Sequence, residues 1–229
     1  MSAAEAGPPI RDAATLILVR RTAAAPQVLM GQRGVGAVFM PDKFVFPGGA
    51  VEAADRELTL PAPLELETAR RLADDADESL AAALARAAVR ELWEETGLLL
   101  GRPEPGAEAL PVPAAWQGFF AQGLVPHTGA LRLVFRAVTP PGRPRRFDAR
   151  FFLAEAGELA GAAHDSFAGA DEELRHLQWL DLAAARALPL PFITEVVLAE
   201  LEPLFADPDL ERPVPFFEQT EAGPRFRML

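Results

Sequence analysis

Short apolar runs separated by polar turns dominate the first part of the chain. Residues 15–19 (TLILV) and 27–30 (QVLM) predict two strands, and the turn at 23–26 between them predicts a β-hairpin. A third short strand is predicted over 44–46 (FVF). This strand runs straight into a proline and two glycines, at 47–49, where the chain must turn.

A long stretch with helical character follows. The clearest helix is predicted over 79–96, because SLAAALARAAVRELWEET is rich in helix-forming residues. Either Ser79 or Asp77 can cap the start of this helix, and Gly97 can end it.

The second half of the chain carries both patterns. Strands are predicted over 130–138 and 150–156, and helices over 182–188 and 191–205, the last with apolar positions at helical spacing. Strands interspersed with a few helices indicate an α/β or α+β fold, built as a mixed sheet covered by helices.

Polar and proline-rich segments lie between these elements. Residues 1–9 are expected to form a flexible lead-in, and 33–43, 53–77 and 102–113 are expected to be mainly irregular. The length of 229 residues suits one domain with generous insertions, so we expect a single domain over 1–229.

Composition narrows the class of protein. Half of the residues are hydrophobic, which argues against wholesale disorder. The 33 acidic residues outnumber the 22 basic ones, so the net charge of −11 gives no general attraction for nucleic acid or an anionic membrane. Cysteine is absent, which excludes disulfides, thiolate metal sites and cysteine nucleophiles. Without a membrane-length apolar run or a secretory signal pattern, a cytoplasmic protein is the expectation.

Candidate chemistry is concentrated at the end of the predicted long helix. Glu91, Glu94 and Glu95 stand at i, i+3 and i+4, so one helical face presents three carboxylates that repel one another. They also lie near the helix C-terminus, where the helix dipole disfavours negative charge. A solvated acidic face is one interpretation, and a site for Mg²⁺ or Mn²⁺ is the other, since hard ions prefer oxygen ligands. Arg90 lies one turn from Glu94 and can pair with it.

The upstream segment 44–52 (FVFPGGAVE) places Gly48 and Gly49 directly after a strand. Glycines allow the backbone to approach a metal or a phosphate closely. A turn that merely ends a strand is the alternative for a lone PGG sequence.

Together these segments resemble the box motif of the Nudix hydrolase family, G-x5-E-x7-R-E-U-x-E-E-x-G-U, in which U is aliphatic. The second half, from Arg90 to Leu98, matches at every specified position. In the first half Asp55 stands in place of the glutamate, and Glu52 is an alternative for part of its role. The spacer over 56–89 has 34 residues instead of seven, so we expect an insertion at 56–78 that bulges out and extends the helix N-terminally.

The resemblance covers about residues 12–205 and implies a Nudix-type α/β/α sandwich with a mixed sheet and an insertion before the catalytic helix. The segments 39–55 and 145–154 further resemble the subfamily that includes peroxisomal coenzyme A diphosphatases and bacterial relatives. The implied activity is a metal-dependent hydrolysis of a diphosphate in a nucleoside-diphosphate derivative, with coenzyme A or acyl-CoA as the candidates. Relatives are often dimers, so a homodimer is a mild expectation.

The resemblance also implies roles for individual residues. Glu91, Glu94 and Glu95 would bind Mg²⁺ or Mn²⁺, with the carbonyl of Gly49 as a further ligand, and Arg90 would orient the carboxylates. Metal ions of this kind activate water and neutralise the diphosphate.

The general base is left open between two places. Glu91 is the first candidate, and Glu172 or Glu173, in the predicted loop 164–179, is the alternative. Arg33 is a candidate for contacting a phosphate of the substrate, although an exposed arginine at a strand end is the more common interpretation. The backbone of Gly48 and Gly49 is a further candidate for binding the substrate.

Two rival functions remain. A Nudix-fold nucleotide sensor or interaction module would keep the fold without catalysis, although such a protein is expected to have lost part of the carboxylate triplet. A purely structural acidic domain would have to match the motif by coincidence.

Overall fold

The computed structural model describes residues 8–73, 76–161, 164–208, 210–220 and 223–229. Most of the lead-in predicted for residues 1–9 therefore lies outside the described residues, as do two positions of the predicted insertion. No helix in the described ranges combines the length and the apolar character that crossing a membrane requires.

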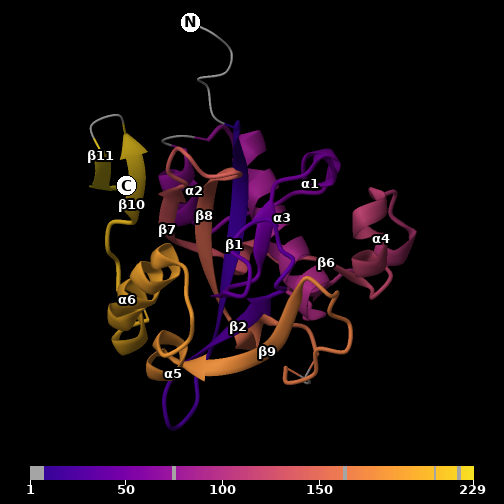
Figure 1. Cartoon of the computed structure of the whole chain (residues 1–229). Coiled ribbons are helices and arrows are strands. Elements are labelled where there is room, and N and C mark those ends of the chain that lie inside the picture. Colours follow the sequence, from indigo (N-terminus) through magenta and orange to yellow (C-terminus); the bar gives the residue numbers. More distant parts are fainter. Residues whose placement is uncertain (1–7, 74–75, 162–163, 209, 221–222) are drawn as a thin grey trace, which may run out of the picture.

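A mixed sheet forms the centre of the molecule (Figure 1). Its strands are β1 (Ile10–Arg20), β2 (Gln27–Arg33), β3 (Phe44–Val45), β4 (Gly48–Ala50), β7 (Arg132–Val138), β8 (Arg146–Glu155), β9 (Leu174–Asp181), β10 (Pro215–Thr220) and β11 (Gly223–Met228). Along the sheet the order is β11-β10-β7-β8-β1-β2-β3, with β4 paired to β1 and β9 paired to β2. The β1–β8 and β7–β10 pairs are parallel and the others are antiparallel.

Helices cover both faces of this sheet (Figure 1). They are α1 (Ala53–Glu57), α2 (Leu66–Leu72), α3 (Glu78–Thr96), α4 (Ala114–Phe120), α5 (Leu182–Arg186) and α6 (Phe192–Ala206). Short 3₁₀ turns occur at η1 (Ala107–Ala109), η2 (Thr128–Ala130) and η3 (Ala156–Glu158). A small separate sheet pairs β5 (Gly101–Pro103) with β6 (Leu124–Pro126).

The central strand β1 shows how the two faces are filled. Alternate side chains of a strand point to opposite faces. Leu16 and Leu18 pack in the core beneath α3, whereas Ile17 and Val19 pack in the second core beneath α6. All four are fully buried. A sheet with a hydrophobic core on each face is an α/β/α sandwich, so the predicted fold class is confirmed.

The long helix α3 begins and ends where the sequence predicts. Of the two cap candidates, Asp77 is the one used, since its carboxylate accepts a hydrogen bond from the Leu80 N–H at 2.8 Å. Gly97 ends the helix with φ +74°, a left-handed conformation that favours glycine.

The first hairpin is also confirmed, since β1 and β2 pair antiparallel and bring Val19 opposite Val28. The Gly48–Gly49 segment is more than a turn, because it forms β4 and places Gly49 opposite Ala14. The predicted loop 164–179 is wrong at its end, where β9 begins and pairs with β2. Helix α4 and the hairpin of β10 and β11 were not predicted.

The segment predicted as an insertion is packed against the body of the protein, so the expected bulging loop is wrong for its described part. Thr68 of α2 accepts a hydrogen bond from the Leu133 N–H of β7 at 3.0 Å. Leu58 and Leu72 are buried in the core on the α3 side. The expected N-terminal extension of α3 is present, as the helix begins twelve residues before Arg90.

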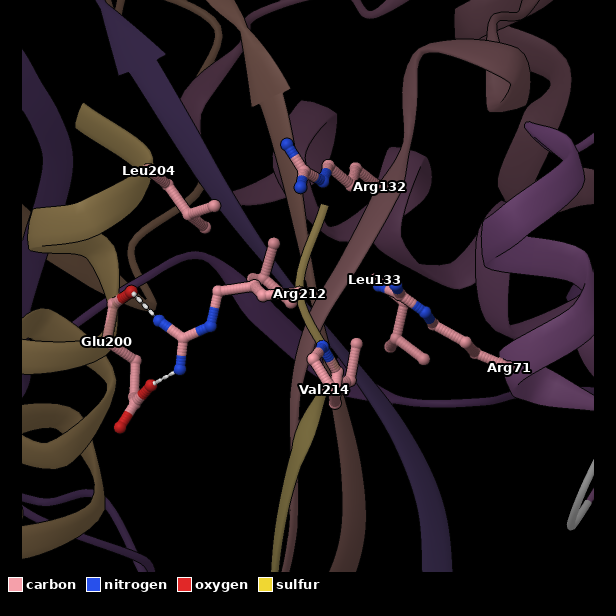
Figure 2. A pocket seen from close by; sticks show the side chains of 9 residues that line it. Arg71, Arg132, Leu133, Glu200, Leu204, Arg212 and Val214 are labelled. Carbon is pink, nitrogen blue, oxygen red and sulfur yellow. Dashed lines mark hydrogen bonds and ion pairs between the residues drawn. The ribbon is translucent and has the colours of Figure 1, made fainter. Parts of the chain in front are cut away.

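Three arginines converge where α2, α6, β7 and the segment before β10 meet (Figure 2). Arg212 donates to the backbone carbonyl and the carboxylate of Glu200, and Arg132 donates to the carbonyls of Pro208 and Leu210. Arg71 pairs with Glu67 at 2.9 Å. The contacts of Arg132 and Arg212 therefore join the segment before β10 to β7 and α6, whereas the Arg71 pair lies within α2.

Candidate active site

The C-terminal half of α3 carries the predicted site, and Arg90 is its centre. The Arg90 side chain is only 3% exposed. Its Nε and Nη2 donate to the two carboxylate oxygens of Asp55 at 2.9 and 3.0 Å. This bidentate pair joins α3 to α1 across 35 residues of sequence, so Asp55 reaches the arginine although it is shorter than glutamate.

The remaining donors of Arg90 hold the neighbouring groups. Its Nη1 lies 2.7 Å from Glu94 Oε2 and 3.0 Å from Glu91 Oε1. Its Nη2 also donates to the backbone carbonyl of Ala50 at 3.2 Å. One buried guanidinium therefore fixes the β4–α1 loop relative to the carboxylates of the helix.

Glu95 lies on the side of α3 that faces β4. Its Oε2 accepts a hydrogen bond from the Gly48 N–H at 2.7 Å, whereas its Oε1 is buried without a hydrogen-bond partner. Gly49 approaches the cluster so closely that a Cβ there would lie 2.4 Å from Glu91 Oε1. The two glycines are thus the residues that allow the backbone to meet the carboxylates.

Burial makes the ionised cluster costly in the absence of a cation. It raises the pKa of Glu91 to about 7, with the Arg90 guanidinium opposing the rise and Glu94 adding to it. Burial also raises the pKa of Glu94, and it raises that of Glu95 well above its usual range, with the negative charge of Glu91 contributing.

These features fit a hard divalent cation. The donor set consists of carboxylate oxygens, and the unpartnered Oε1 of Glu95 is a buried acceptor that lacks a donor. In the described ranges, however, no three acidic or histidine side chains already surround a common point as in a formed metal site. The reason is visible in the contacts, because Glu91 and Glu94 turn towards Arg90 and Glu95 turns towards Gly48.

A loop from the other end of the chain crosses the end of α3. Gly169 packs on Gly97 so tightly that a Cβ at Gly97 would lie 2.9 Å from the Gly169 backbone. The Asp171 N–H donates to the Glu94 carbonyl at 2.8 Å. This crossing brings Glu173 near enough for its charge to raise the pKa of both Glu91 and Glu95.

Comparisons with known proteins agree with this architecture. A crystal structure of a NUDIX hydrolase from Alicyclobacillus acidocaldarius shares 31% sequence identity and a TM-score of 0.59, over 89% of this chain and 94% of that one. The chain belongs to the Nudix hydrolase family.

Two further similarities are more limited. Nudix hydrolase 7 of Caenorhabditis elegans is 39% identical over 89 residues, which are 39% of this chain and 22% of the worm protein. The NUDIX domain of Shewanella oneidensis NrtR, solved with ADP ribose, is 14% identical with a TM-score of 0.49 over 89% of this chain and 98% of that chain. No protein-family model matches the chain.

Within the Nudix fold, the two candidate glutamates of the late loop differ. Glu173 forms an ion pair with Arg33, with Arg33 Nη2 and Glu173 Oε1 2.7 Å apart. Glu172 is exposed, and across the described residues it forms no hydrogen bond or ion pair with the carboxylate cluster. Arg33 is therefore directed at a carboxylate, and its contact with a substrate phosphate stays a prediction.

Several other polar and aromatic residues have structural contacts. Arg150 is buried and pairs with Asp12 at 2.7 Å and with Asp148 at 3.3 Å. Phe151 and Phe152 are buried in the core. His127 is buried beside Glu158.

Sequence reasoning missed Arg86, which lies one turn before Arg90 on α3. Arg86 is 8% exposed and donates to the carbonyls of Asp55 and Leu60 at 3.0 and 2.6 Å. A signal was present, since an arginine at i−4 from Arg90 on a helix lies on the same face. Its partners are two backbone carbonyls, which the residue types in a sequence cannot reveal.

Proposed function

We propose that this Nudix protein is a metal-dependent hydrolase that cleaves the diphosphate linkage of a nucleoside-diphosphate derivative. The observation that carries the proposal is the arrangement around Arg90. This one side chain contacts Asp55, Glu91, Glu94 and the Ala50 carbonyl, and so joins both halves of the family motif.

The carboxylates are assigned as the metal ligands. Glu91, Glu94 and Glu95 would hold Mg²⁺ or Mn²⁺, with the Gly49 carbonyl as a further ligand. A divalent ion in this position supplies neutralisation of the diphosphate and activation of water. The chain itself supplies positioning, since Arg90 orients Glu91 and Glu94, and the Gly48 N–H orients Glu95.

Glu91 is the first candidate for the general base and Glu173 is the alternative. Glu91 lies within the cluster, beside Gly49. Support for Glu173 comes from its salt bridge to Arg33 and from its charge, which faces Glu91 and Glu95. Glu172 has no comparable support.

We propose coenzyme A or acyl-CoA as the substrate. The support is the sequence resemblance of segments 39–55 and 145–154, together with the long spacer within the box. In the structure these two segments flank β1, because β8 pairs with one edge of β1 and β4 pairs with the other. The Phe39 and Phe147 rings pack edge to face with centroids 5.2 Å apart, which adds an apolar surface to this region.

A substrate panel tests this proposal. Coenzyme A, acetyl-CoA, NADH, ADP-ribose, diadenosine polyphosphates and nucleoside triphosphates are incubated with Mg²⁺ and then with Mn²⁺, and mass spectrometry identifies the products. Release of 3′-phospho-AMP and a phosphopantetheine would support the full proposal. Cleavage of another compound would support diphosphate hydrolysis but overturn coenzyme A or acyl-CoA as the substrate.

The same panel separates the enzyme from its rival. A nucleotide sensor would bind a compound without cleaving it, whether or not metal is present. Binding without turnover for every compound would therefore overturn the hydrolase proposal.

A further inference from the structure

A cavity of about 430 Å³ lies away from the carboxylate cluster. One wall is the segment 58–63, which follows α1 within the predicted insertion, and the opposite wall comes from β5, β6 and η2. Small-molecule sites commonly have volumes of several hundred Å³ and mainly apolar walls. Apolar side chains here include Leu58, Leu60, Leu110 and Val125.

The wall formed by the insertion is held in place by specific hydrogen bonds. Arg86 of α3 donates to the carbonyls of Asp55 and Leu60, on either side of the start of this segment. At its other end, the Thr128 hydroxyl of η2 donates to the Pro63 carbonyl at 2.8 Å. The cavity is therefore bounded by fixed backbone on the insertion side.

The polar groups at the cavity favour an anion. Arg102 of β5 lines it, and in the described part of the chain its guanidinium has no ion-pair partner. Arg86 also lines it and bonds only to backbone carbonyls, whereas Glu104 is the single carboxylate among the lining residues. The lining thus carries two arginines against one acid.

His127 adds a buried polar ring to the same wall. It is 6% exposed, and its Nδ1 lies 3.4 Å from Glu158 Oε2. Burial and then the charge of Arg102 lower the pKa of His127, whereas Glu158 opposes this shift.

We propose that this cavity is a second ligand site, which binds a small organic anion with an apolar body. The apolar body packs on the leucines of the insertion, and the acidic group meets Arg102. This inference goes beyond the proposed hydrolysis, because the site binds its ligand without the metal or the carboxylates.

The site is distinct from the carboxylate cluster on geometric grounds. Arg86 and Glu95 are nine residues apart on α3, about two and a half turns, so their side chains leave opposite sides of the helix. The turn of α1 that carries Asp55 lies between Arg86 and Arg90, bonding to both. Glu91, Glu94 and Glu95 do not line the cavity.

The test uses 8-anilinonaphthalene-1-sulfonate as the probe, an aromatic body with one sulfonate, added to the metal-free full-length protein. Gly129→Leu is designed to fill the cavity, since a Cβ at Gly129 lies no closer than 3.7 Å to the Pro63 carbonyl oxygen and 3.8 Å to the His127 ring. Arg102→Gln removes the free guanidinium. Arg143→Gln, in the exposed turn after β7, is the matched control.

Wild type and Arg143→Gln are expected to bind one probe molecule with the same Kd. Arg102→Gln is expected to raise Kd by about tenfold, the loss of a charged hydrogen bond, and Gly129→Leu to abolish saturable binding. Near-ultraviolet circular dichroism confirms that each variant is folded. Equal binding by all four proteins would overturn the proposal, because the probe would then lie elsewhere.

Sedimentation velocity completes the test. If Gly129→Leu changes the oligomeric state, the cavity is a contact for a second copy of the chain, and the ligand-site proposal is overturned. Because the probe is bound without metal or turnover, failure here leaves the proposed hydrolysis untouched, and failure of the hydrolysis leaves this site untouched.

Discussion

The two halves of the Nudix motif in this chain are built in different ways. The second half, from Arg90 to Leu98, lies on one helix and its ending, so helical spacing alone brings its carboxylates together. The first half lies on β4 and α1, and only long-range contacts join it to the helix. Those contacts are the bidentate Arg90–Asp55 pair and the hydrogen bond from Gly48 to Glu95.

This difference explains why a long spacer is tolerated. Residues 56–89 intervene between the halves, yet the ends of the spacer are fixed by Arg86 and Arg90, which both bond to Asp55. The residues inserted between the fixed ends can form α2 and the wall of a cavity without changing the positions of the carboxylates on α3.

Removal of the Arg90–Asp55 ion pair, which connects the two halves of the motif, is expected to have the largest effect. Asp55→Asn leaves the buried Arg90 charge without its bidentate partner, so the free energy of unfolding should fall by about 3 kcal/mol. Denaturant unfolding measures this. Exposed Glu57→Gln, two residues later in α1, is the control and should cost under about 1 kcal/mol. An equal loss of unfolding free energy in both variants would show that Asp55 does not connect the two halves of the motif.

Within the second half, Glu94→Gln is expected to reduce turnover by at least about a hundredfold, because a metal ligand is lost. The fold should survive, since the change also relieves repulsion between neighbouring carboxylates. Steady-state kinetics on the best substrate, with thermal unfolding beside it, measures both. Glu78→Gln, exposed in the first turn of the same helix, should retain full activity. Near-normal turnover by Glu94→Gln would refute the ligand assignment.

A smaller effect is expected in the loop that crosses the helix. Glu173→Gln should lower turnover by about tenfold, roughly 1.4 kcal/mol, because its charge faces Glu91 and Glu95. Glu172→Gln, its exposed neighbour, should stay within about twofold. If Glu173→Gln reduces turnover as much as Glu94→Gln does, Glu173 rather than Glu91 is the general base.

The two glycines are expected to differ in the property that each one affects. A Cβ at Gly48 would lie 2.6 Å from the Ala14 carbonyl oxygen, so Gly48→Ala should cost about 1–3 kcal/mol of stability. A Cβ at Gly49 would meet only the Glu91 carboxylate, so Gly49→Ala should impair turnover more than stability. Parallel unfolding and kinetic measurements compare them, and the reverse pattern would contradict the assigned roles.

The sequence predicted those parts of the fold that depend on local pattern. Helix α3 follows from helix-forming residues between Asp77 and Gly97, and the first hairpin follows from two apolar runs. Helix α4 escaped prediction because it is only seven residues long and follows a proline-rich stretch. The strands β9, β10 and β11 were missed because polar residues and prolines interrupt their apolar pattern.

As with the fold, only those parts of the site that depend on local sequence spacing could be predicted. Helical spacing indicates the cluster of Glu91, Glu94 and Glu95, and the pairing of Arg90 with Glu94. Tertiary contacts decide the rest, since they bring Asp55 to Arg90 and direct Arg33 to Glu173. A single sequence contains no spacing that relates these partners.

If Glu91, Glu94 and Glu95 hold a catalytic metal ion, turnover must depend on divalent metal. Metal-stripped wild type is assayed on its best substrate with a chelator present, and Mg²⁺ or Mn²⁺ is then titrated back. We expect no turnover at first and a saturable recovery, which Glu94→Gln fails to reproduce at the same metal concentrations. Undiminished turnover with the chelator present would contradict this expectation.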